Sequence, residues 1–117
     1  MTAPNVVAVA TITGKSAVQA VGTSATAIVS NAGGSGKVIK INALLVSNIE
    51  NSTAYSITVD LYRSSTAYRV ATAISVPANS TLDVINKSFY LEEDDSLRLT
   101  ANSASKLEAI CSYEEIS

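Results

Sequence analysis

Strict alternation of apolar and polar side chains between Tyr55 and Tyr62 constrains the fold of this chain more than any other feature. In this stretch the odd-numbered residues are Tyr, Ile, Val and Leu, and the even-numbered residues are Ser, Thr, Asp and Tyr. Successive side chains of a β-strand point to opposite faces, so a period of two indicates a strand with one face in a core. The same period returns in the C-terminal segment, where Leu107, Ala109, Cys111 and Tyr113 share one face.

Further apolar segments, each bounded by residues typical of turns, predict more strands along the chain. The expected strands cover Thr26–Asn31, Lys37–Asn48, Tyr55–Tyr62, Ala67–Val76, Thr81–Leu91, Ser96–Ala101 and Lys106–Ile116. Their short connections favour antiparallel pairing, because parallel strands need long crossovers. About seven or eight short strands at this spacing predict an all-β fold, a single antiparallel β-sandwich of immunoglobulin-like or jelly-roll winding.

The chain has 117 residues, which is the size of one domain. Residues 25–117 are expected to form the sandwich core. Residues 1–24 are expected to form an N-terminal arm and a first strand. Val6, Val7, Val9 and Ile12 suit either a strand of the sandwich or an extended arm that pairs with a neighbouring subunit, whereas Gly14–Ser24 carries little signal.

The residue inventory argues against catalysis. The chain has no histidine, which is the usual partner of a serine or cysteine nucleophile and the commonest metal ligand, and it has a single cysteine. We therefore expect no enzyme, no catalytic residues, no cofactor and no metal site. The net charge is −2, with no basic run, so nucleic-acid binding is not expected. No signal peptide and no membrane-spanning segment are expected either, which predicts a protein made in a cytoplasm.

Two loops resemble ligand sites and are better explained as turns. Gly33–Lys37 lacks the spacing of a phosphate-binding loop and precedes an expected strand rather than a helix. Glu92–Asp95 offers adjacent carboxylates without the alternate-position spacing of a calcium loop. We expect a mobile turn with an exposed lysine in the first case and a solvated turn in the second.

Binding residues are sought among the aromatic and apolar side chains. Tyr62, Tyr68 and Arg69 flank one expected turn, and tyrosine and arginine are favoured where proteins contact each other. Tyr62 falls on the outward face of its strand. The candidate interaction residues are therefore Val6, Val7, Val9, Tyr62, Tyr68 and Arg69. The alternative for the tyrosines is that they fill the ends of the core, and Cys111 is expected to be a small buried apolar side chain.

Several strand-and-turn stretches carry a resemblance to a known group of proteins. They are Ala27–Asn31 with Lys37–Asn42, Val76–Leu82, and Tyr90–Arg98 with Ser112–Ile116. In these stretches the chain resembles small virion structural proteins of tailed bacteriophages, including phages of cyanobacteria. The resemblance covers about the last three-quarters of the chain and contains no catalytic motif.

This resemblance implies a β-sandwich present in many copies in the virion. The expected function is capsid decoration, in which a cement protein stabilises the shell through multivalent contacts with the major capsid protein or other virion proteins. A homo-oligomer, with a trimer favoured, would suit symmetric junctions of a shell. The alternatives are a tail, neck or fibre-attachment component, and a module that binds a carbohydrate or a host-surface ligand.

Overall fold

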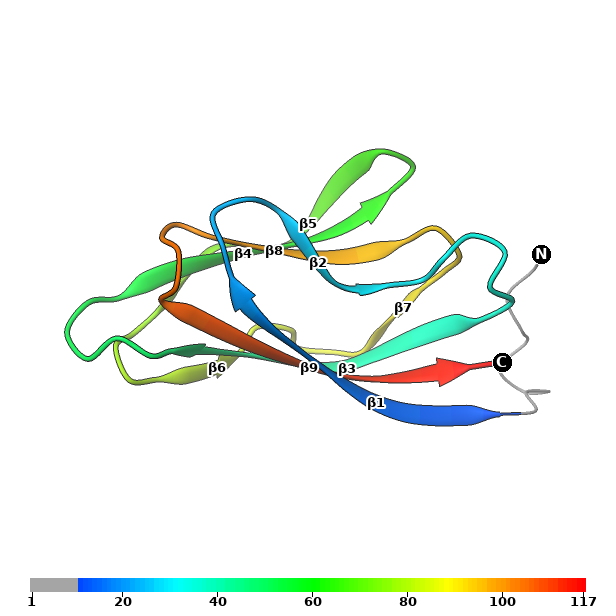
Figure 1. Cartoon of the computed structure of the whole chain (residues 1–117), viewed down its shortest axis with the longest axis horizontal. Coiled ribbons are helices and arrows are strands. Elements are labelled where there is room, and N and C mark those ends of the chain that lie inside the picture. Colours follow the sequence, from blue (N-terminus) through cyan, green and yellow to red (C-terminus); the bar gives the residue numbers. More distant parts are fainter. Residues whose placement is uncertain (1–10) are drawn as a thin grey trace.

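Nine strands, and no helix among the described residues 11–117, make up the computed structural model of the chain (Figure 1). The strands are β1 (Ile12–Val21), β2 (Thr26–Ser30), β3 (Val38–Asn48), β4 (Tyr55–Arg63), β5 (Thr66–Val76), β6 (Thr81–Asp83), β7 (Phe89–Leu91), β8 (Ser96–Ala101) and β9 (Leu107–Ile116). The expected all-β fold is confirmed.

The strands form two antiparallel sheets. Sheet A has the order β1-β9-β3-β6, with β7 also paired to β3, and sheet B has the order β2-β8-β4-β5. The pairs β1 with β9, β2 with β8, β3 with β6 and β7, and β4 with β5 are nested inside one another, as in one long hairpin rolled into two layers. This is the jelly-roll winding, one of the two windings that the sequence left open.

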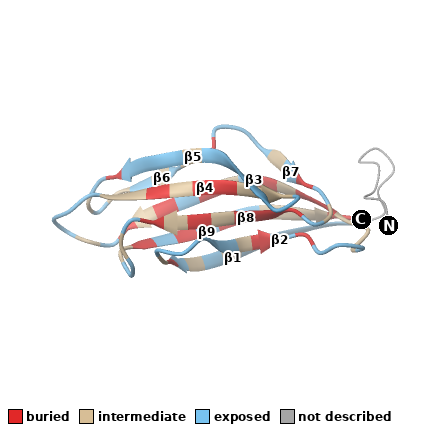
Figure 2. Ribbon diagram, turned by 90° about the horizontal axis from the view of Figure 1, so that it is seen from above, coloured by how far each residue is buried: buried red, intermediate tan, exposed pale blue. Residues whose placement is uncertain are grey.

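The core lies between the two sheets. It contains Leu44 and Cys111 from sheet A and Ile57, Val59 and Leu99 from sheet B, all with no exposed surface. Figure 2 shows buried positions alternating with less buried ones along β8, as the period of two predicts, whereas β5 is exposed along most of its length. The alternation in β4 therefore follows from the core that its odd-numbered residues enter.

One strand forms where the sequence carried little signal, and one expected strand is wrong. β1 takes up most of Gly14–Ser24, the stretch without a clear pattern, and pairs with β9 along its whole length. The expected strand Thr81–Leu91 is broken into β6 and β7. The break follows from Asp83, whose carboxylate accepts a hydrogen bond from the backbone N–H of Ile85 at 3.2 Å and turns the chain away from the ladder.

Candidate functional site

A row of exposed apolar side chains crosses the outer face of sheet A. Val18 on β1, Ile110 on β9 and Leu45 on β3 are direct partners in the strand register. Their exposed fractions are 76%, 48% and 39%. Side chains that face each other across neighbouring strands stand about 5 Å apart, so the three form one continuous contact surface. We call this surface the apolar row.

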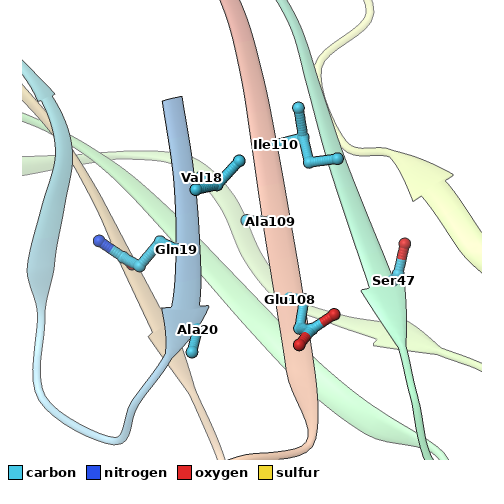
Figure 3. Close-up of a pocket in the computed structure, with 7 residues that line it drawn as sticks. All are labelled: Val18, Gln19, Ala20, Ser47, Glu108, Ala109 and Ile110. Atoms are coloured by element: carbon cyan, nitrogen blue, oxygen red, sulfur yellow. The ribbon is translucent and has the colours of Figure 1, made fainter. Parts of the chain in front are cut away.

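The rows on either side of the apolar row consist of side chains that are small or polar. Ser16 and Ser112 are partners on one side, and Ala20 and Glu108 are partners on the other. Next to Val18 and Ile110 the surface is hollowed by about 330 Å³ (Figure 3). The hollow is lined by Val18, Gln19, Ala20, Ser47, Glu108, Ala109 and Ile110. Small neighbours leave the apolar row accessible to a flat partner rather than enclosed for a small ligand.

The candidate residues of β4 and β5 do not form one site. Arg69 pairs with the buried carboxylate of Asp60 on the outer face of sheet B. The guanidinium of Arg98 lies 3.4 Å from the centre of the Tyr62 ring and covers one face of it. Tyr62 is half-buried in this cluster. Tyr68 is exposed, but it is the register partner of Leu61 and so lies on the opposite face of the sheet.

Val6, Val7 and Val9 lie outside the described residues, so the contact expected for the N-terminal arm stays a prediction. The described chain begins beside the C-terminus, where the backbone N–H of Thr11 donates to the carbonyl oxygen of Ser117 at 2.9 Å and the N–H of Ser117 donates back at 2.9 Å.

The two loops that resemble ligand sites pack against each other at one end of the sandwich. A methyl group on Gly33 would overlap a carboxylate oxygen of Asp94, so the loops approach too closely there for a side chain. Glu93 accepts a hydrogen bond from the backbone N–H of Gly36 at 2.9 Å. The Gly36 N–H, one of the backbone donors that a phosphate would need, is therefore bound to the turn Glu92–Asp95.

Arg63, at the end of β4, forms an ion pair with Asp95 of the turn Glu92–Asp95. Arg63 donates from Nε to Oδ1 of Asp95 at 2.8 Å and from a terminal nitrogen to Oδ2 at 2.6 Å. This two-point contact with a buried carboxylate raises the pKa of the Arg63 guanidinium. Asp95 also accepts from the backbone N–H of Glu92 at 2.7 Å. These bonds satisfy the Asp95 carboxylate within the protein. Asp95 is buried, so the expectation of a solvated turn is wrong at this position.

The groups that most often bind metals or act as nucleophiles are few in the described part of the chain. Within residues 11–117 no three His, Cys, Asp or Glu side chains are grouped as a metal site would require. Cys111 is fully buried, as expected, and its burial raises the pKa of the thiol to about 11. No helix in the described part of the chain is long and apolar enough to span a membrane.

The sequence interpretation missed the apolar row. Ile110 alternates out of phase with the buried residues of its own strand, so its outward position was readable from the pattern of Leu107–Tyr113. Val18 lies in the stretch without a pattern, and its place opposite Ile110 depends on a register that only the folded chain provides.

These features define a jelly-roll β-sandwich with an exposed apolar row on one sheet. No family model and no curated protein sequence matches the chain. A solved structure of Bacillus endospore appendages, described as a novel family of disulfide-linked pili, is similar to it with a TM-score of 0.55. The sequence identity is 16%, and the match covers 92% of this chain and 88% of that chain. At this identity the likeness shows a shared fold.

Proposed function

We propose that this chain is a structural subunit of a large protein assembly and that it binds its neighbours through the outer face of sheet A. The apolar row carries the proposal. Val18, Ile110 and Leu45 stand in register on three adjacent strands and are exposed in the middle of the sheet. Covering them with another protein would remove their apolar surface from water, which favours association.

The assembly we propose is the virion of a tailed bacteriophage, with the chain as a capsid decoration protein bound to the major capsid protein. The resemblance of its strand-and-turn stretches to small virion proteins supports this. Jelly-roll sandwiches also form viral capsid domains, which is an analogy at the level of the fold. The protein would be made in the host cytoplasm and then become part of the particle.

In this role the chain acts by binding alone and catalyses no reaction. A subunit that binds the closed shell better than an open one stabilises the closed state by linkage. Many identical weak contacts, each made by one apolar row, add their effects through multivalency. A homo-oligomer, with a trimer favoured, would place several rows over one symmetric junction of the shell.

A second candidate function is that of a filament subunit. The observation that favours it is the shared fold with the Bacillus endospore appendages, which are pili. A tail, neck or fibre-attachment component remains the nearest alternative within the virion. A carbohydrate-binding module would use Tyr62 and Arg69 on sheet B instead, but the covered face of the Tyr62 ring leaves less surface for a sugar.

Immunogold electron microscopy with an antibody against the purified chain distinguishes these assemblies. Labelling spread over icosahedral shells supports the decoration role. Labelling confined to one vertex or to tails supports a tail or neck component, and labelled filaments without shells support the second candidate. Absence of the chain from every large assembly, combined with binding to a glycan array, would refute the structural role.

A triple variant, Val18→Thr with Leu45→Thr and Ile110→Thr, tests the apolar row. Threonine is β-branched, as Val18 and Ile110 are, so it suits a strand, and it carries a hydroxyl group in place of apolar surface. The three exposed fractions amount to about one and a half fully exposed side chains, and burial of one such side chain contributes about 2 kcal/mol. The variant should therefore lose about 3 kcal/mol of binding free energy per copy, or about 100-fold in affinity for its assembly.

Ile74→Thr is the matched control for this triple variant. Ile74 is 40% exposed on β5 of sheet B and is not part of the apolar row. It should leave binding unchanged, and all of these variants should fold, as circular dichroism can verify. Binding of the triple variant with wild-type affinity would contradict the proposal.

A further inference from the structure

Besides the apolar row on its outer face, sheet A has a second feature open to another protein, which is the free edge of β1. β1 has ten residues and pairs with β9 alone in sheet A, so its other edge has no strand partner among the described residues 11–117. A long edge strand offers a row of backbone donors and acceptors to any strand that approaches it. Proteins usually protect such edges.

The other three edges of the described sandwich are protected. β6 and β7 have three residues each, and β2 has five residues with a bulge between Ala27 and Val29. β5 is longer, but its pairing with β4 shifts register twice and its Ala73 has a left-handed φ of 46°. Short length, bulges and twist all discourage pairing with another chain. β1 has no bulge and no proline.

The hydrogen-bond pattern shows which groups of β1 face outward. Thr11 and Ser117 exchange both backbone hydrogen bonds, so they are a hydrogen-bonded pair. Pairs alternate along an antiparallel ladder, and the register of β1 with β9 continues without a shift. The even-numbered residues of β1 therefore direct their N–H and C=O groups to the free edge. They are Ile12, Gly14, Ser16, Val18 and Ala20, whose side chains lie on the same outer face as the apolar row.

We propose that β1 pairs antiparallel with β1 of a second copy of this chain, across a two-fold axis at Ser16. This inference rests on the proposed structural role and names one partner surface for it. An isologous pair needs only one regular edge per subunit, which β1 supplies. In this register all five outward-facing residues are paired, giving about ten interchain hydrogen bonds, and Val18 lies opposite Gly14 of the second copy.

Charge selects this register over a neighbouring one. Lys15 is the single charged residue of β1, and its ammonium group binds Glu115 at 3.1 Å within its own sheet. A register shifted to bring Lys15 opposite Lys15 of the second copy would set two like charges side by side, which destabilises a strand pair. With Ser16 on the axis, Lys15 faces Ala17 of the second copy instead.

The size of the contact sets its strength. Ten residues span about 34 Å along the strand, and a sheet is about 10 Å thick, so each copy buries about 350 Å². The total of about 700 Å² is below the 1,200 Å² or so of a stable interface. The pair is therefore weak and reversible on its own, and it gains strength when the apolar rows of many copies are held in one assembly.

Cysteine cross-linking tests the register. Ser16→Cys places two thiols directly opposite each other across the axis, where Cα atoms of a hydrogen-bonded pair are about 5.5 Å apart, within disulfide range. Gly14→Cys and Val18→Cys are matched controls, because each should fail to cross-link alone but should cross-link when the two variants are mixed. A side chain at Gly14 meets no atom within 4 Å, and Cys111 is buried and stays silent.

Sedimentation equilibrium tests the pairing itself. The average mass should rise above 12.1 kDa towards twice that value at high protein concentration, and Ser16→Pro and Ser16→Lys should both abolish the rise. The Ser16 N–H faces the free edge, so proline removes no bond of the monomer, and lysine leaves the backbone unchanged. Circular dichroism confirms that both variants fold.

Three results would overturn the proposal: a constant monomer mass at the highest concentration, cross-linking of Gly14→Cys alone as fast as Ser16→Cys, or loss of association in Val70→Lys on β5. The last result would indicate pairing of unlike edges. A chain that stays monomeric yet labels a shell or filament in the microscope would refute this pairing and leave the proposed structural role standing.

Discussion

Replacement of Asn48 by alanine should destabilise the fold more than its size suggests. Asn48 ends β3 and is 3% exposed. Its amide nitrogen donates to the carbonyl oxygens of Thr53 and Val76, both at 2.9 Å, and its amide oxygen accepts from the backbone N–H of Glu50 at 2.9 Å. One side chain therefore joins the ends of β3 and β5 and the loop after β3.

The loss of unfolding free energy can be worked out from the backbone groups that lose their hydrogen-bond partner in Asn48→Ala. Asn48→Ala leaves the buried carbonyl oxygen of Val76 without this donor, which costs about 1–3 kcal/mol, and the two other bonds are worth about 0.5 kcal/mol each because water can replace them. The total is about 3 kcal/mol. The unfolding entropy of a 117-residue chain is about 0.25 kcal/mol/K, so Tm should fall by about 12 °C.

Ser47→Ala is the matched control on the neighbouring position of the same strand. The Ser47 hydroxyl bonds only to the exposed hydroxyl of Thr81, at 2.7 Å, so its loss should change the unfolding free energy by less than about 0.5 kcal/mol. Urea unfolding followed by circular dichroism, with an unchanged m-value, measures both variants. Equal midpoints for Asn48→Ala and Ser47→Ala would refute the large cost assigned to the buried hydrogen bonds of Asn48.

Three further predictions follow from the ionisable groups. Asp95→Asn should lower the unfolding free energy in urea titration by about 2 kcal/mol, because it breaks the two-point contact that Arg63 makes with a buried carboxylate; an unchanged midpoint would contradict this. Cys111 should react with a thiol reagent only at the rate of unfolding, since the thiol is buried and its pKa is raised to about 11, and fast labelling of the native protein at pH 8 would be incompatible with this burial. The hydrogen bond from Lys15 lowers the pKa of Glu115 below its ordinary value of 4.5, so this stability is present above pH 4.5 and is lost as the pH falls through the lowered pKa. Glu115→Gln should flatten the acid side of a pH–stability curve, and an unchanged acid limb would count against this ion pair.

The strands of the core were predictable because burial of one face requires apolar residues at alternate positions of the sequence. Ile57 and Val59 are fully buried, and the residues next to them are polar, so the period of two in β4 was visible without any partner. The sequence did not distinguish the two windings, because a strand buried on one face has the same pattern wherever it lies in a sandwich. The nested pairing of β1 with β9 and β2 with β8 decides this, and it depends on contacts between distant residues.

The loops were predictable as turns but their roles were not. Gly33–Lys37 and Glu92–Asp95 are typical turn compositions, and both form turns between strands. The packing of these two loops on each other, with Asn31 between them, could not be predicted from the sequence. The buried Asn31 side chain donates to the carbonyl oxygens of Lys37 and Leu91 at 2.8 and 3.1 Å. A polar residue buried at a sheet end looks like a surface turn residue until its partners are known.

The weak pattern of β1 has the same physical origin as its proposed role. Its inward-facing side chains include Thr13, Lys15 and Gln19 as well as the small Ala17, so neither face of β1 is consistently apolar and no period of two appears. A strand of this kind is positioned by the ladder with β9 rather than by its own burial. Its outer edge is then governed by backbone hydrogen bonds, which are independent of side-chain identity. β1, the strand with the weakest hydropathy pattern, is therefore the strand best suited to pair with a second strand. Its small and weakly polar side chains cause little steric clash or charge repulsion with an approaching strand.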